Sequence, residues 1–149
     1  MKLLRFLQQT LIDEMKNRRI EWSQQFEVGV DQLDDDHGNI VELINEFGMN
    51  CCTDRAKPIL DNLFEVTREH FDSEEKFLIK NGLSHKIHQD EHRNILQKLR
   101  KYIDDPSNYS DTTYCDESFE KLAGWFIDHS IGLDSEIKAY FDSGTMRFN

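Results

Sequence analysis

Residues 70–92 read HFDSEEKFLIKNGLSHKIHQDEH and contain four of the six histidines of this 149-residue chain. The Asn81-Gly82 pair divides the stretch, because glycine commonly ends a helix in the left-handed conformation. On either side, histidines and acidic residues recur at intervals of three and four, the spacing of one helix face. The stretch therefore predicts two helices joined by a short turn, each with histidines on one face.

The same helical period extends along almost the whole chain, and no strand pattern or repeat stands out. Apolar residues at steps of three and four predict helices over residues 2–18, 33–48, 53–80, 84–103 and 115–141. Short connections between amphipathic helices are typical of bundles. We expect an all-α fold, an antiparallel up-and-down four-helix bundle with an extra N-terminal helix.

The charge and composition narrow the class of partner. Lys and Arg total 18 against 29 Asp and Glu, a net charge of −11, which disfavours nucleic acid and anionic membranes. The apolar runs are too short for membrane insertion, and the N-terminus lacks a signal-peptide pattern, so we expect a cytoplasmic protein. The three cysteines, Cys51, Cys52 and Cys115, are odd in number and form no metal-binding C-x-x-C, so free thiols without a disulfide are expected.

Five histidines lie on the apolar faces of four predicted helices: His37, His70, His88, His92 and His129. A single histidine on such a face is usually a core residue with a hydrogen-bond partner. Five facing one core would need five buried partners if neutral, and would repel one another if charged. A metal removes both difficulties by taking the nitrogen lone pairs, so the pattern predicts metal binding.

Two carboxylates accompany these histidines. Glu74 follows His70 by four residues and shares its face. Asp134 follows His129 by five, which separates the two by about 140° on a regular α-helix. We therefore predict a local π-turn, eased by Gly132, that brings them together.

The number of ligands indicates how many ions they bind. Five imidazoles and two carboxylates exceed the needs of one ion but suit two, with both carboxylates bridging and one position left open. This mixture of nitrogen and oxygen ligands favours iron over Mg or Ca and leaves Mn and Co as alternatives.

Two other kinds of metal site are alternatives to this two-ion site, a zinc-peptidase site and a ferritin-like di-iron site. Residues 88–92 match H-x-x-E-H, a zinc-peptidase motif in which Glu91 would activate water. That reading leaves three core histidines unused, and Glu91 is otherwise a solvated helix position. A ferritin-like di-iron oxidase would need paired E-x-x-H motifs, which the chain lacks. The spacing alone does not exclude His85 as a further ligand.

Taken together, the motifs resemble the hemerythrin family, in particular its bacterial hemerythrin-like domains. The matching segments are W-x3-F-x-V-G-V-x2-L-D-x-D-H at 22–37, H-F-x2-E-E at 70–75, H-x3-H at 88–92 and W-F-I-D-H-x4-D at 125–134. The resemblance implies two iron ions with a bridging oxo or hydroxo group. It assigns His88, His92 and His129 to a six-coordinate iron, His37 and His70 to an iron with an open position, and Glu74 and Asp134 to the bridges. His85 has no counterpart and becomes a bystander.

The resemblance also implies reversible binding of dioxygen, in a pocket without a free acid or base, so we expect no enzymatic activity. The expected lining is Ile40, Val41, Ile44, Phe71, Phe77, Phe126 and Ser130. Ser130 departs from the apolar residue usual in the family, and a polar group there favours faster autoxidation. From this residue and the extra N-terminal helix we expect an oxygen or redox sensor domain with a fused or partner signalling domain, such as a diguanylate cyclase or chemoreceptor. A stand-alone oxygen carrier or store is the alternative.

The resemblance suggests how the chain divides. The expected parts are an N-terminal helical extension at 1–19, a hemerythrin-like di-iron bundle at 20–143 and a C-terminal tail at 144–149.

Overall fold

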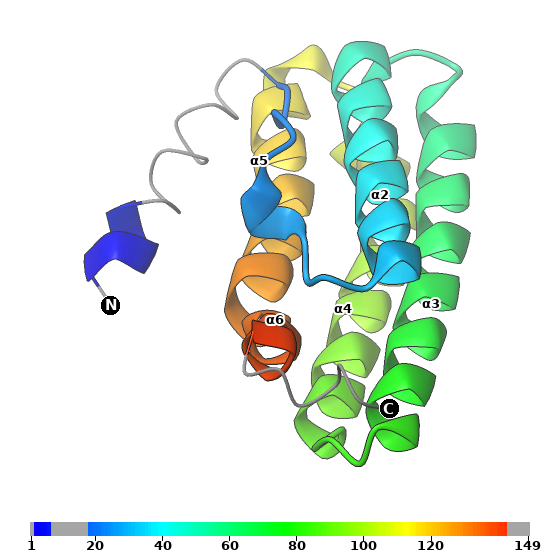
Figure 1. Ribbon diagram of the computed structural model, residues 1–149. Coiled ribbons are helices and arrows are strands. Elements are labelled where there is room, and N and C mark those ends of the chain that lie inside the picture. The colour runs from blue at the N-terminus through cyan, green and yellow to red at the C-terminus, as the bar shows by residue number, and fades with distance from the viewer. Residues whose placement is uncertain (1, 7–17, 143–149) are drawn as a thin grey trace.

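The structure is a computed structural model that describes residues 2–6 and 18–142 (Figure 1). Within these ranges the regular secondary structure is helical, which confirms the all-α class predicted from the sequence. Four long helices lie side by side in Figure 1: α2 (Asp31–Asn50), α3 (Ala56–Lys80), α4 (Lys86–Ile103) and α5 (Cys115–Ile127). The helix expected over residues 2–18 is helical at residues 2–6, and residues 7–17 lie outside the described part of the chain.

The single helix predicted over 115–141 consists of three consecutive elements. The helix α5 is followed by the π-helix η4 (Asp128–Leu133) and the helix α6 (Ser135–Asp142). The amide of Asp134 donates to the carbonyl of His129 at 3.0 Å, a bond spanning five residues instead of four. The predicted π-turn is therefore confirmed, and it turns both residues toward the same side of the helix.

The turn between α3 and α4 has the hydrogen bonds of a Schellman motif. Gly82 has a φ of +66°. The amide of Leu83 donates to Leu78 O at 2.9 Å, and that of Gly82 donates to Ile79 O at 3.1 Å. These bonds satisfy the last carbonyls of α3 and end the helix where the Asn81-Gly82 pair predicted.

The segment that precedes α2 packs against the bundle instead of extending into solvent. Asn45 fixes it through two hydrogen bonds to Ile20, one from the Ile20 amide at 2.6 Å and one to the Ile20 carbonyl at 2.9 Å. Gly48 permits this approach, because a Cβ there would lie 2.6 Å from the carbonyl of Arg18. Within the segment, the short 3-10 helix η1 (Gln24–Phe26) buries Phe26 completely and places its ring 5.3 Å from that of Phe126.

The apolar core has two parts. The larger cluster fills the space between the four long helices and includes Phe47, Leu60 and Phe119, all fully buried. A smaller cluster around Leu33, Leu78 and Ile137 packs α2 and α3 against α6. None of the helices in the described part of the chain combines the length and apolarity needed to cross a bilayer.

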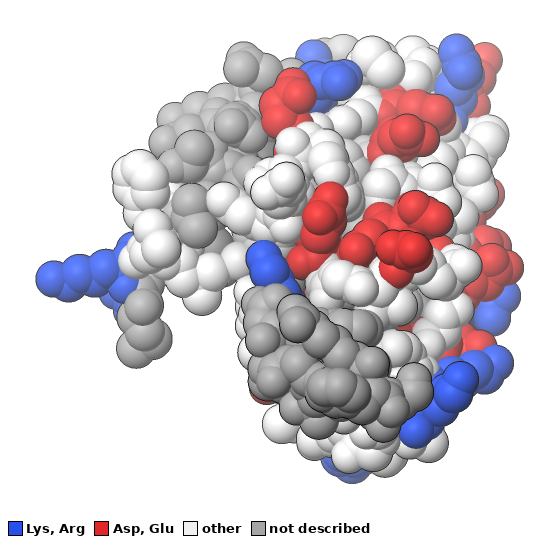
Figure 2. Space-filling model, in the orientation of Figure 1, with Lys and Arg blue, Asp and Glu red and all other residues white. Residues whose placement is uncertain are grey.

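Acidic side chains are conspicuous on the surface shown in Figure 2, gathered around the start of α2. Asp31 and Asp35 in the first turns of that helix are exposed. Acidic residues are favourable at a helix N-terminus, because the unpaired backbone amides there carry partial positive charge.

The expectation of free thiols is wrong for two of the three cysteines. Cys51, at the end of α2, forms a disulfide with Cys115, the first residue of α5, across a sequence separation of 64 residues. Cys52 is the free cysteine of the described chain. An odd count and irregular spacing do not reveal such a pairing, because only the packing of α2 against α5 brings the two sulfurs together.

Candidate metal centre

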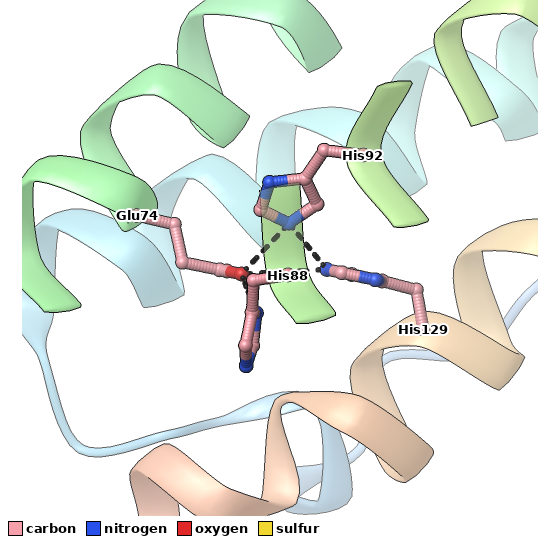
Figure 3. Close-up of side chains that lie close together, drawn as sticks. All are labelled: Glu74, His88, His92 and His129. Carbon is pink, nitrogen blue, oxygen red and sulfur yellow. Dashed lines mark hydrogen bonds and ion pairs between the residues drawn. The ribbon is translucent and has the colours of Figure 1, made fainter. Parts of the chain in front are cut away.

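Seven ionisable side chains converge in the interior from four parts of the bundle. The helix α2 supplies His37, α3 supplies His70 and Glu74, α4 supplies His88 and His92, and the π-helix region supplies His129 and Asp134. Each is buried, with at most 3% of its surface exposed. Figure 3 shows four of them, from three separate elements, pointing toward one another. The structure thus brings together all seven residues singled out from the sequence.

The first group is built around His37 and His70. Nδ1 of His37 donates to the carbonyl of Phe26 at 2.6 Å, and Nδ1 of His70 donates to Oδ2 of Asp36 at 3.0 Å. Carbonyl and carboxylate oxygens only accept, so each Nδ1 carries a proton and each neutral ring keeps its lone pair on Nε2. The two Nε2 atoms lie 3.1 Å apart. Two lone pairs at this distance require positive charge between them.

The second group repeats this arrangement with His92 and His129. Nδ1 of His92 donates to Glu75 at 2.9 Å, and Nδ1 of His129 donates to Glu91 at 3.2 Å. The Nε2 atoms of the two rings are 3.3 Å apart. His88 joins this group from one turn earlier on α4, with Nδ1 2.9 Å from Oε1 of Glu74.

The two carboxylates each face both groups. Glu74 places Oε2 3.2 Å from Nε2 of His70 and Oε1 3.0 Å from Nε2 of His92. Asp134 places Oδ2 3.2 Å from Nε2 of His37 and Oδ1 3.0 Å from Nε2 of His129. Both oxygens of Asp134 and Oε2 of Glu74 are buried without a hydrogen bond of acceptable geometry. Leaving charged oxygens in this state is costly, so their surroundings fit two cations bridged by both carboxylates.

The pKa shifts show the same demand for positive charge. Burial alone would lower the pKa of His70, but its contacts with Asp36 and Glu74 raise it to about 9. Burial is likewise outweighed at His129, where Asp134 and Glu74 raise the pKa well above its usual value. Burial opposes ionisation of Glu74, yet its histidine partners hold its pKa well below the usual range. His70 in the first group and His129 in the second therefore bind a proton readily at the place where a metal ion would lie.

Three carboxylates outside the cluster hold the imidazole rings in place, a role that was assigned to none of them from the sequence. They are Asp36, Glu75 and Glu91, each accepting from an Nδ1. Glu91 is partly solvated, with 37% of its side chain exposed, and in addition its carboxylate accepts from His129. That bond is on the ring edge away from the cluster, which also argues against Glu91 as a base acting on metal-bound water. In the sequence, each of these three carboxylates is directly adjacent to a predicted ligand, and this was the one feature that could have identified them.

A cavity of about 40 Å³ adjoins the cluster, room enough for a molecule the size of water or dioxygen. It is bordered by His37, His70 and His129 from the cluster. Five of the residues expected to line a pocket do so: Ile40, Ile44, Phe71, Phe126 and Ser130. The remaining wall, not foreseen from the sequence, is Leu63, Thr67, Ile95, Leu99, Leu122 and Trp125.

Two expected lining residues do not reach this cavity. Val41, one residue beyond Ile40, packs into the main core cluster. Phe77 lies about one turn beyond Glu74 and packs against the smaller cluster with Leu83. Helix periodicity identified their core-facing side correctly, but it does not determine which part of the core each side chain reaches.

Ser130 and His85 are the two polar residues whose roles the sequence left least certain. The hydroxyl of Ser130 is buried at the cavity and has no hydrogen-bond partner among the described residues. His85 lies outside the cluster, at the start of α4, with Nδ1 3.4 Å from the carbonyl of Leu83.

Comparison with known proteins identifies the family. The sequence profile of the hemerythrin HHE cation binding domain matches residues 28–139, a range that contains all seven clustered residues. The chain belongs to the hemerythrin family. It is also similar to a bacteriohemerythrin of Clostridium acetobutylicum, with 26% identity over 127 residues that cover 77% of this chain and 95% of the relative. Family membership and the buried cluster fit a metal-binding hemerythrin domain.

Proposed function

We propose that this hemerythrin-family chain holds two iron ions and binds dioxygen reversibly as an oxygen or redox sensor domain. The observation that carries the proposal is that histidine Nε2 atoms face each other at two places, His37 with His70 and His92 with His129. Two carboxylates, Glu74 and Asp134, lie between these places and face both. This arrangement supports two cation positions with shared bridges.

The unequal number of histidines suggests how the two positions differ. Three imidazoles (His88, His92 and His129), two carboxylates and a bridging oxo or hydroxo group would fill six positions on one iron. His37 and His70 with the same bridges would leave one position open on the other. Both of these histidines border the cavity, so an open position there would be reachable by a small ligand. When bound, the iron pair would supply the electrons that dioxygen requires, and the protein would supply the enclosed pocket.

The sensor role is favoured over a stand-alone carrier or store by one observation. The unpartnered Ser130 hydroxyl offers a hydrogen bond inside an otherwise apolar cavity. Polar groups near bound oxygen favour its loss as a reduced species, and a centre that oxidises readily reports oxygen well but stores it poorly. No enzymatic activity is proposed, and a zinc-peptidase role is disfavoured because Glu91 is bonded to His129.

The proposal extends to organisation and location. The four long helices are taken as an antiparallel up-and-down bundle spanning 20–143, with residues 1–19 as an extension and 144–149 as a tail. We place the protein in the cytoplasm, where a fused or partner signalling domain would receive the change at the iron site. Short connections between successive long helices support the bundle order.

The decisive experiment reduces the protein anaerobically, adds oxygen while following its absorbance, and quantifies metal on the same sample. Two irons per chain with a visible band that appears on oxygenation and disappears on deoxygenation is the expected result. A band that decays quickly to the oxidised form would favour the sensor, and a persistent band the carrier. One metal per chain, or zinc without an oxygen response, would overturn the proposal.

A further inference from the structure

The three cysteines form a second cluster, at the C-terminal end of α2, whereas the metal-centre residue His37 lies near the start of that helix. Sγ of Cys52 lies 2.9 Å from Sγ of Cys115 and 3.8 Å from Sγ of Cys51. The disulfide partners are buried, Cys51 with 9% and Cys115 with 2% of its surface exposed, whereas Cys52 is half-buried. The cluster therefore combines an enclosed disulfide with a more accessible free thiol in contact with it.

We propose that this cluster is a thiol–disulfide exchange site, with Cys52 as the entry thiol and Cys115 as the sulfur that alternates between Cys52 and Cys51. Its substrates are low-molecular-weight disulfides and thiols. The site is separate from the metal centre and does not depend on iron being bound.

The backbone at Cys52 supports a specific role for this residue. Cys52 has a φ of +71°, a left-handed conformation that is unfavourable for any residue with a Cβ. Its amide donates to the carbonyl of Tyr109 at 2.9 Å, which holds this conformation and fixes the turn after α2 against the loop before α5. Strained residues of this kind persist where the surrounding structure over-determines them, often at functional sites.

The small disulfide is the only oxidant that the exchange reaction needs. Starting from three thiols, the Cys52 thiolate attacks the small disulfide, forming a mixed disulfide and releasing one small thiol. The Cys115 thiolate attacks Sγ of Cys52, which forms a Cys52–Cys115 bond and releases the second small thiol. The Cys51 thiolate then attacks Sγ of Cys115, which gives the observed Cys51–Cys115 bond and returns Cys52 as a thiol. Two protons pass from protein thiols to the two small thiols, and the small disulfide takes the two electrons.

The geometry indicates that exchange between the Cys52 thiol and the Cys51–Cys115 disulfide needs a side-chain rotation. A thiolate attacks along the S–S axis, so Cys52 in line with the bond would lie about 2 Å farther from one sulfur than from the other. The two measured distances differ by less than half of that. Rotation about the Cα–Cβ bond of Cys52 or Cys115 must therefore precede exchange.

The test follows disulfide formation from the fully reduced full-length chain, under anaerobic conditions, with oxidised glutathione as the probe. Samples quenched with acid and alkylated are analysed by peptide mass spectrometry, with fragmentation between residues 51 and 52 to separate the adjacent sulfurs. For the wild-type chain we expect a Cys51–Cys115 product with Cys52 alkylated. Cys52→Ser should form the same bond at least tenfold more slowly, and Cys115→Ser should stop at a glutathione adduct on Cys52.

A further variant checks the alternation itself. Cys51→Ser should form a Cys52–Cys115 disulfide at close to the wild-type rate, since only the last step is lost. Circular dichroism establishes that each variant is folded before its kinetics are compared. Wild-type rates in Cys52→Ser, or an adduct on Cys51 in Cys115→Ser, would overturn the proposal, as would a Cys51→Ser chain that forms no internal disulfide.

Discussion

Nδ1 of His129 lies 3.2 Å from Oε1 of Glu91, so a carboxylate on α4 orients an imidazole that belongs to the π-helix. The same relationship joins His92 to Glu75 and His70 to Asp36. A carboxylate bonded to Nδ1 fixes the tautomer of a ligating histidine and makes Nε2 a stronger donor to the metal. These outer contacts convert a group of core histidines into a preorganised set of ligands.

Glu91→Ala is expected to weaken metal binding about tenfold to hundredfold, the range typical for loss of such an outer partner. Glu91→Gln should lose less, because the amide oxygen still accepts a hydrogen bond from His129. Asp90→Ala is the matched control, since Asp90 is exposed and pairs with Lys86 at 3.0 Å. Competition against a chelator of known affinity measures the metal affinity of each variant. Equal losses of affinity in Asp90→Ala and Glu91→Ala would show that the hydrogen bond from His129 to Glu91 is unimportant for metal binding.

On the proposed two-iron site, His37→Ala should reduce the bound iron from two ions to one per chain, because His37 belongs to the group with only two imidazoles. His85→Ala should leave both ions bound, since His85 lies outside the cluster. Iron and protein quantified together on each purified variant decide the matter. Loss of an ion in His85→Ala would require the ligand assignment to be redrawn.

Most of this centre could be predicted from the sequence, because the interval between two ligands on one helix determines whether they lie on the same face. His70 and Glu74 at an interval of four predict a common face, and an interval of five between His129 and Asp134 predicted the π-turn that the structure contains. What the sequence did not reveal depends on contacts between helices. The acceptors of each Nδ1, the side of the core reached by Phe77 and the Cys51–Cys115 bond all arise from tertiary packing.

The metal-free protein is expected to lose stability as pH rises above neutrality. The pKa of His70 is raised to about 9 from an ordinary value of 6.5, so its protonation stabilises the fold fully below pH 6.5. That contribution disappears as pH rises through about 9, and His129, whose pKa is also raised, acts in the same direction. The depressed pKa of Glu74 contributes stability above its usual 4.5 and does not offset this loss.

Thermal unfolding measured across this pH range, before and after metal loading, tests the prediction. The Tm of chelator-treated protein should fall between pH 6.5 and about 9, whereas the loaded protein should change little, because its ligands are already deprotonated. A flat profile for the metal-free protein would mean that protons do not occupy the positions assigned to metal.

Ser130→Ala should lengthen the time that the iron-loaded protein stays oxygenated by several-fold. The substitution removes a buried hydroxyl without a partner and leaves the cavity wall otherwise intact. Ser118→Ala is the control for loss of a buried hydroxyl elsewhere, since Ser118 bonds the carbonyl of Asn108 outside the cavity. Decay of the absorbance band in air gives the lifetime, and no change in Ser130→Ala would remove the main support for a sensor over a carrier.

Cys115→Ser is expected to lower the free energy of unfolding by about 2–4 kcal/mol, because the disulfide at this position closes a long loop in the unfolded chain. Cys51→Ser should cost much less under oxidising conditions. In that variant Cys52, 2.9 Å from Cys115, can close a loop only one residue shorter. Urea unfolding with and without reductant separates the two variants, since reductant should bring wild type and Cys51→Ser down to the level of Cys115→Ser. Equal losses for the two variants without reductant would mean that Cys52 does not replace Cys51 as the partner of Cys115.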